Sequence, residues 1–245
     1  MHTIYFLGGL GGNRHQVKEL AEFLGQTLVY IDLPGHGQNM QDMVTSPLEL
    51  RDWFAAKIDT SAPFYLIAHS MGANLATFLA IQFPQLEKLV LLDGGYFQFD
   101  SFESLEEDLA GTENFLKETI FTDIEAIIEQ EKASASYWSR HMEEAIRETF
   151  IWKDDAYRFH LNKESILELI RLQREFENLL SQVTCSTLLI AQSDKETLDS
   201  KQQMLATVPQ HIHLNTSLDC GHSPHTEKPE QTAQVIREFL EIPVQ

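Results

Sequence analysis

The first 95 residues alternate short β-prone runs with stretches of helical periodicity, and this alternation limits the fold more than any other feature of the sequence. The β-prone runs are rich in Val, Ile, Leu, Phe and Tyr and lie at 3–7, 27–31, 64–68 and 86–92. The segments between them carry apolar residues three and four positions apart, and they lie at 17–24, 47–58 and 71–82. Strands that alternate with helices in this way predict a parallel sheet with helices on both faces.

The alternation stops near residue 96 and resumes near residue 187. The intervening segment is polar, with short apolar stripes at helical spacing. Beyond it, two more strands and a last helix are predicted, at 187–191, 211–215 and 229–240. We therefore expect one domain, with a core made of residues 1–95 and 181–245, and a helical insert at 96–180 that acts as a lid over the sheet.

Charge and cysteine content exclude several classes of protein. The formal net charge of −19 repels nucleic-acid phosphate and anionic lipid, so neither nucleic acid nor membrane is expected as a partner. Two cysteines without a Cys-x-x-Cys pair support neither a redox motif nor a zinc knuckle. The apolar N-terminal run lacks a basic region, and no segment approaches the roughly 18 apolar residues that span a bilayer. We expect a soluble, cytoplasmic protein.

Ser70 lies between a predicted strand and a predicted helix, in the sequence Ala-His-Ser-Met-Gly at 68–72. A nucleophilic serine at such a turn needs small residues two positions before and after it, because strand and helix must pass closely. Ala68 and Gly72 meet this need. The N-terminus of the helix also favours negative charge that develops near Ser70. An ordinary helix N-cap would equally be a serine here, so this motif alone leaves both interpretations open.

His222 and Asp194 would complete a catalytic set with Ser70. Each follows a predicted strand, so each is expected at the carboxyl edge of the sheet, where Ser70 also lies. Three residues of suitable type at three strand ends are hard to obtain by chance. Glu196 is close enough to Asp194 to be a second candidate for the acid.

A glycine-rich segment, Gly-Gly-Leu-Gly-Gly at 8–12, follows the first predicted strand. Glycines let the backbone approach a substrate closely, and an acyl-transfer intermediate carries a negatively charged oxygen that needs N–H donors. We expect the backbone N–H groups of Leu10 and Met71 to be these donors. A plain glycine turn or a dinucleotide site are the alternatives for the segment.

Taken together, these motifs resemble the α/β-hydrolase superfamily, in particular its small, lidded, esterase-like members. The matching segments cover nearly the whole chain except the insert, and they are 6–12, 32–37, 68–73, 91–95, 188–194 and 221–229. The resemblance implies an α/β-hydrolase fold with a mainly parallel sheet of about six strands, helices on both faces and a helical lid. It also implies that Ser70, Asp194 and His222 are the catalytic triad, in the order that this family uses.

The sequence departs from the family pattern at three points. It begins at the strand that would be the family's third, so the usual N-terminal hairpin is expected to be missing. Gly8 stands where many members have histidine, which changes the polarity of the loop but keeps its backbone. Ala191 replaces a frequent glycine before the acid.

Candidates for substrate binding come from the glycine loop and from the insert. They are Gly9, Tyr96, Trp138, His141 and Tyr157. Aromatic residues on amphipathic helices are more often core residues, so these assignments rest on their place in the insert. No metal site is expected, because the His-x-His pair at 211–213 lies in a strand without nearby carboxylates.

The expected reaction is the hydrolysis of a carboxylic ester, a small-molecule substrate, by a serine hydrolase through an acyl-enzyme intermediate. No cofactor is required, and the sequence leaves the oligomeric state open. One alternative uses the same triad to cleave a C–C bond in a small keto acid, or to eliminate from it. This alternative needs cationic side chains for the carboxylate, and the insert offers five arginines, at 140, 147, 158, 171 and 174.

Two further alternatives belong to other classes of protein. One is a non-catalytic small-ligand receptor on the same fold, which only a turnover assay separates from an enzyme. The other is a nicotinamide-dependent oxidoreductase, since Asp32 follows the glycine segment at a spacing typical of a ribose-binding acid. The third glycine of the dinucleotide motif is absent, however, and the oxidoreductase leaves the motifs at Ser70 and His222 unexplained.

Overall fold

The computed structural model describes residues 2–97, 99, 103–193, 209–215 and 217–243. Its centre is a parallel sheet of six strands in the order β2-β1-β3-β4-β8-β9. The strands are β1 (Thr3–Leu7), β2 (Leu28–Ile31), β3 (Phe64–His69), β4 (Leu86–Leu92), β8 (Ser186–Ile190) and β9 (Ile212–Asn215). The six-stranded parallel sheet predicted from the sequence is confirmed.

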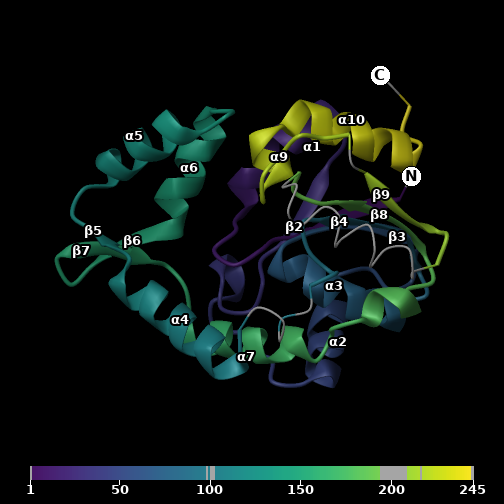
Figure 1. The fold of residues 1–245 in the computed structure, drawn as a ribbon, viewed down its shortest axis with the longest axis horizontal. Helices are drawn as coiled ribbons and strands as arrows, with labels where there is room; N and C mark the ends of the chain where they lie inside the picture. The colour runs from purple at the N-terminus through teal and green to yellow at the C-terminus, as the bar shows by residue number, and fades with distance from the viewer. Residues whose placement is uncertain (1, 98, 100–102, 194–208, 216, 244–245) are drawn as a thin grey trace.

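Helices cover both faces of this sheet (Figure 1). One face carries α1 (Lys18–Leu24), the short α9 (Pro224–Glu227) and α10 (Pro229–Leu240). The other face carries α2 (Pro47–Ala55), α3 (Met71–Gln82) and α7 (Lys163–Arg174). Each layer encloses its own apolar core cluster, which explains why the middle strands are apolar on both sides.

Local sequence accounts for where several of these helices begin. Ser46 caps α2 by accepting a hydrogen bond from the Glu49 amide, and proline stands at the first position of α2. Proline likewise opens α10. The apolar face of α10 then packs on α1 through Ala233 and Ile236, which are fully buried.

The segment between β4 and β8 extends beyond one end of the sheet (Figure 1). Its elements before α7 are α4 (Leu105–Glu118), β5 (Ile120–Phe121), α5 (Ile124–Ser134), α6 (Arg140–Thr149), β6 (Phe150–Lys153) and β7 (Ala156–Phe159). A 3-10 helix, η4 (Leu179–Gln182), follows α7. Although α7 belongs to the same segment, its buried residues Ile166 and Leu169 join the core cluster of α2 and α3.

The expectation that the insert is purely helical needs a correction, because β5, β7 and β6 form a small antiparallel sheet. β6 and β7 make a hairpin whose two turn residues, Asp154 and Asp155, have φ angles of +52° and +56°. Positive φ at both turn positions is typical of the tight turns that match the twist of paired strands, and Asp is tolerated there. The β-prone sequence on either side of the two aspartates was the signal for this hairpin.

Two short 3-10 helices lie in the connections near the carboxyl edge of the sheet. They are η1 (Arg14–Val17), which precedes α1, and η2 (Gly37–Asn39), which follows β2. No helix in the described part of the chain is long and apolar enough to cross a membrane.

Candidate active site

Ser70 lies at a sharp turn between β3 and α3. Its φ of +53° falls in the left-handed region, where a non-glycine residue typically costs about 1–3 kcal/mol and is often found at functional sites. The turn also brings α3 against the glycine loop, because a Cβ added at Gly72 would lie only 2.2 Å from the Gly8 carbonyl oxygen. The small residue expected at position 72 is therefore required by space.

His222 links Ser70 to a carboxylate. Its Nε2 lies 2.9 Å from Ser70 Oγ, and its Nδ1 lies 2.7 Å from Oδ2 of Asp93. An ionised carboxylate only accepts hydrogen bonds, so Nδ1 carries the proton and Nε2 is left to accept from the Ser70 hydroxyl group. This is the tautomer that a histidine needs in order to act as a base toward serine.

Asp93 directly follows β4, the strand next to β3, and it is 1% exposed. Its second oxygen, Oδ1, accepts hydrogen bonds from the Tyr96 hydroxyl group at 2.5 Å and from the Gln192 amide at 3.0 Å. Burial acts to raise the pKa of the Asp93 carboxyl group, but its hydrogen bonds, that from His222 foremost, outweigh burial and lower it. Asp93 is thus held as a buried, oriented carboxylate.

Asp194 and Glu196, the acids suggested by the sequence, lie outside the described residues. Sequence reasoning selected the strand end at 194 and passed over Asp93, although the segment at 91–95 was among those that carried the family resemblance. The signal for Asp93 was available, because an aspartate that directly follows a buried strand reaches the same sheet edge as Ser70.

The loop that carries His222 is held from two sides. The Glu227 carboxylate accepts from the amides of Gly221 at 2.6 Å and Ser223 at 2.9 Å, which fixes the backbone around His222. The His69 Nε2 lies 2.9 Å from the His222 carbonyl oxygen. Burial, with the neighbouring His222, lowers the pKa of His69 to about 4, so His69 is neutral and donates this bond.

The glycine loop lies against Ser70, since a Cβ at Gly9 would come within 2.9 Å of Ser70 Cβ. Two amides of the loop bond within the protein. The Gly11 amide donates to His36 Nε2 at 3.0 Å, and the Gly12 amide donates to the Gly9 carbonyl oxygen at 3.0 Å. Leu10 lies between Gly9 and Gly11, whereas Met71 is the first residue of α3, where amides have no partner within the helix.

A cavity of about 1020 Å³ opens beside Ser70 and His222. More than half of its lining residues come from the segment 96–180, and many are apolar or aromatic. Of the substrate-binding candidates, Gly9 and Trp138 line the cavity. Tyr96 bonds to Asp93, His141 lies in a polar cluster on α6, and Tyr157 packs against Trp152; these three are not among its lining residues.

The charge of the cavity wall is informative. The described residues that line the cavity include Glu131 and Glu227 but no Lys or Arg. None of the five arginines of the insert is among these lining residues, and four of them pair with carboxylates, namely Arg140, Arg147, Arg171 and Arg174. Among the described residues, the cavity wall therefore has no Lys or Arg side chain to bind a substrate carboxylate.

The fold and the arrangement at the sheet edge are those of a hydrolase of the α/β class, and comparison with known proteins agrees. The family model described as "Alpha/beta hydrolase family" matches residues 4–235, so the chain belongs to this family. The family assignment suggested by the sequence motifs is confirmed.

Curated relatives match over part of their length. The chain is 33% identical to Protein ABHD8 of Bos taurus over 105 residues, which are 38% of this chain and 24% of that protein. It is 28% identical over 147 residues to the dihydrolipoyllysine-residue acetyltransferase component of the acetoin cleaving system of Cupriavidus necator, covering 57% of this chain and 37% of that protein. The matched segments thus span between about a quarter and two fifths of these relatives.

Solved structures match over nearly the whole chain and show the same fold. E-2-(acetamidomethylene)succinate hydrolase superposes with a TM-score of 0.76 at 18% identity, covering 98% of this chain and 91% of that one. An esterase of M. tuberculosis superposes with a TM-score of 0.71 at 18% identity, covering 98% and 85%.

Proposed function

We propose that this protein hydrolyses carboxylic esters, with Ser70 as the nucleophile, His222 as the base and Asp93 as the carboxylate that orients His222. The observation that carries the proposal is the continuous set of hydrogen bonds from Asp93 through His222 to Ser70, which ends at the wall of a large cavity. Membership of the α/β-hydrolase family supports it.

The proposed reaction has two steps. Ser70 Oγ attacks the ester carbonyl carbon while His222 Nε2 takes the hydroxyl proton, and the amides of Leu10 and Met71 bind the oxygen that becomes negative. His222 then gives its proton to the leaving alkoxide as the C–O bond breaks. Water attacks the acyl-enzyme in the same way, with His222 again as the base, and releases the acid and free Ser70.

The cavity supports an uncharged, largely apolar acyl group as the substrate part that binds. Aromatic and aliphatic side chains of the segment 96–180, such as Phe121, Trp138 and Ile146, form much of its wall. We propose on the same ground that this segment acts as the lid that selects the substrate. A keto-acid substrate for C–C bond cleavage is less well supported, because the described lining of the cavity contains no Lys or Arg.

The test is a panel of p-nitrophenyl esters of graded acyl length, assayed with the unmodified protein and with Ser70→Ala. We expect turnover of the esters in the unmodified protein and its loss in Ser70→Ala. Ser134→Ala is the matched control, since Ser134 lines the same cavity and its hydroxyl group bonds to the carbonyl oxygens of its own helix. Substantial turnover by a folded Ser70→Ala variant would refute the mechanism, and no turnover of any ester by the unmodified protein would favour the receptor alternative.

A further inference from the structure

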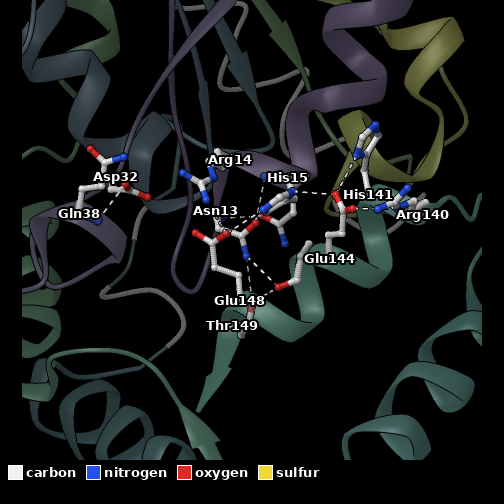
Figure 2. Close-up of polar contacts among 12 residues, drawn as sticks. Asn13, Arg14, His15, Asp32, Gln38, Arg140, His141, Glu144, Glu148 and Thr149 are labelled. Carbon is white, nitrogen blue, oxygen red and sulfur yellow. Dashed lines mark hydrogen bonds and ion pairs between the residues drawn. The ribbon is translucent and has the colours of Figure 1, made fainter.

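A second cluster of titratable side chains lies where the insert meets the core, apart from Ser70 and His222. It consists of His15 on η1 and of His141 and Glu144 on α6 (Figure 2). The Nδ1 atoms of His15 and His141 both lie 3.2 Å from one atom, Oε2 of Glu144. The ligand atoms of the three side chains lie within 4.8 Å of one another.

A second carboxylate lies on the far side of each imidazole. His15 Nε2 lies 2.8 Å from Glu148 Oε2, and His141 Nε2 lies 3.6 Å from Glu22 Oε1. A proton on His15 Nε2 satisfies Glu148 and leaves the Nδ1 lone pair of His15 directed toward Glu144. His141 Nδ1 lies within hydrogen-bond distance of Glu144 Oε2, and it would give up its proton when a metal ion binds. A carboxylate that holds the outer nitrogen of a histidine is also the usual partner of a metal-binding imidazole.

This arrangement brings three possible metal ligands together, namely the Nδ1 atoms of two imidazoles and a carboxylate oxygen. Once His141 Nδ1 is deprotonated, these three atoms repel one another unless a positive charge lies between them. His15 Nδ1 is the clearest sign of this need, because the atom is buried and has no hydrogen-bond partner despite its closeness to Glu144. A buried acceptor without a partner is costly, so the cluster is arranged for a cation.

The distances fit a transition-metal ion. Zinc binds histidine nitrogen and carboxylate oxygen at about 2.0–2.1 Å, and two ligands of a tetrahedral ion then lie about 3.3 Å apart. Both nitrogen-to-oxygen distances in the cluster are 3.2 Å. Two histidines and one carboxylate are also a donor set typical of zinc.

We propose that His15, His141 and Glu144 form a binding site for a divalent transition-metal ion such as Zn²⁺, with Glu148 and Glu22 orienting the two imidazoles. The side chains of His15, His141 and Glu144 are 20%, 30% and 32% exposed, so the ion can enter from solvent and water can fill the fourth position. No metal site was expected from the sequence, where the His-x-His pair at 211–213 was the candidate considered; His15 and His141 are far apart in the chain.

The position of the site gives the ion a structural consequence. Asn13, at the start of η1, already donates to the Ala145 carbonyl oxygen at 2.9 Å and to Thr149 Oγ1 at 3.1 Å, both on α6 (Figure 2). An ion shared by η1 and α6 adds a further link between the glycine loop and the insert. Because α6 also lines the cavity through Met142 and Ile146, the ion would hold one wall of the cavity in place.

Positive charges beside the cluster oppose a bound cation, and Arg14 Nη2 lies 3.5 Å from Glu148 Oε2 on one side. Arg140 Nε lies 2.9 Å from the other oxygen of Glu144, Oε1, on the solvent side of the cluster. Arg140→Gln removes this charge and leaves the three ligands intact, so it should bind Zn²⁺ more tightly than the unmodified protein does. In this variant the affinity for Zn²⁺ should rise, whereas in variants of the ligands it should fall.

The experiment is calorimetric titration of the chelator-treated full chain with Zn²⁺ at neutral pH, together with the visible absorption of bound Co²⁺. We expect one ion per chain and the Co²⁺ bands of a tetrahedral site. Affinity should fall by about 100-fold or more in His141→Asn and Glu144→Gln, and by about 10- to 100-fold in Glu148→Gln. His213→Asn is the matched control, because it removes an exposed histidine of β9, and its affinity should equal that of the unmodified protein.

Three outcomes would overturn the proposal. They are the absence of stoichiometric Zn²⁺ binding to the unmodified protein, a Zn²⁺ affinity of His141→Asn and Glu144→Gln equal to that of the unmodified protein, and a Co²⁺ spectrum without the bands of a tetrahedral site. The Co²⁺ spectrum of the unmodified protein needs no variant, so it tests the site even if a variant fails to fold. The readouts do not involve ester turnover, so the metal site stands or fails independently of the proposed function.

Discussion

Asparagine in place of Asp93 should remove the base function of His222 while the fold persists. Both structural hydrogen bonds, from Tyr96 and from the Gln192 amide, end on Oδ1, whereas His222 bonds to Oδ2. An asparagine can keep its oxygen at the first position and place its NH₂ group at the second. The NH₂ group would then donate to His222 Nδ1, so the proton moves to Nε2 and faces Ser70.

The magnitude follows from this change of tautomer. An imidazole with its proton on Nε2 cannot accept the Ser70 proton, and the loss of the carboxylate also removes the charge that stabilises the imidazolium. The same substitution in a serine-protease triad costs about 10⁴ in kcat. We expect Asp93→Asn to lower kcat by about 10³- to 10⁴-fold, which is about 4–5 kcal/mol of transition-state stabilisation, with little change in KM.

The assay compares kcat for a p-nitrophenyl ester, and the rate of Ser70 labelling by a fluorophosphonate, in Asp93→Asn and Asp194→Asn. The second variant makes the same change at the acid that the sequence suggested, and it should stay within a few-fold of the unmodified protein. Circular dichroism checks that both variants fold. The reasoning fails if Asp93→Asn keeps kcat within tenfold of the unmodified protein, or if Asp194→Asn is the variant that loses activity.

Three further predictions concern stability and specificity. Burial lowers the pKa of both His36 and His69 to about 4, below the value of about 6.5 in an unfolded chain, so the unfolded state binds the extra protons between these values. The free energy of unfolding, measured in urea, should therefore fall from about pH 6.5 to about pH 4, by up to about 3 kcal/mol for each histidine; a flat profile would contradict this. Gly72→Ala should abolish ester turnover or folding, because the added Cβ would collide with the Gly8 carbonyl oxygen. Gly111→Ala is the control: it lies on the exposed helix α4, no atom lies near the added Cβ, and the free energy of unfolding should rise by about 1 kcal/mol. Trp138→Ala should shift the ratio of kcat/KM for long and short acyl esters by about 1–3 kcal/mol while Ser70 labelling persists, and an unchanged ratio would exclude Trp138 as a specificity residue.

Local signals in the sequence were enough for the sheet and for two of the three residues proposed for catalysis. Strand propensity and helical periodicity act within ten or so residues, so the six strands and the helices around them could be predicted without knowledge of their neighbours. Ser70 and His222 could be proposed because each directly follows a strand, and parallel strands bring their carboxyl ends to one edge.

The choice of acid depended on the tertiary structure. Asp93 and Asp194 both follow strands, and nothing in their local sequence says which carboxylate reaches His222 Nδ1. The order of the sheet places β4 directly beside β3, and the Tyr96 hydroxyl group and the Gln192 amide then fix the orientation of Asp93. These contacts join residues from separate strand ends, and such contacts leave no periodic trace in the sequence.

The insert also shows what local sequence signals can predict and what depends on tertiary contacts. Its apolar stripes predicted helices, but the antiparallel sheet of β5, β6 and β7 forms through pairing between segments, which local propensity does not specify. Likewise, nothing in the sequence relates His15 in η1 to His141 in α6, which was a candidate for substrate binding, and the two form a cluster only because α6 docks on η1. The sequence alone determined the sheet, the serine turn and the histidine loop, since each follows from neighbouring residues. The tertiary structure decided the partners of His222, the walls of the cavity and the proposed metal site, because each depends on side chains that folding brings together from distant parts of the chain.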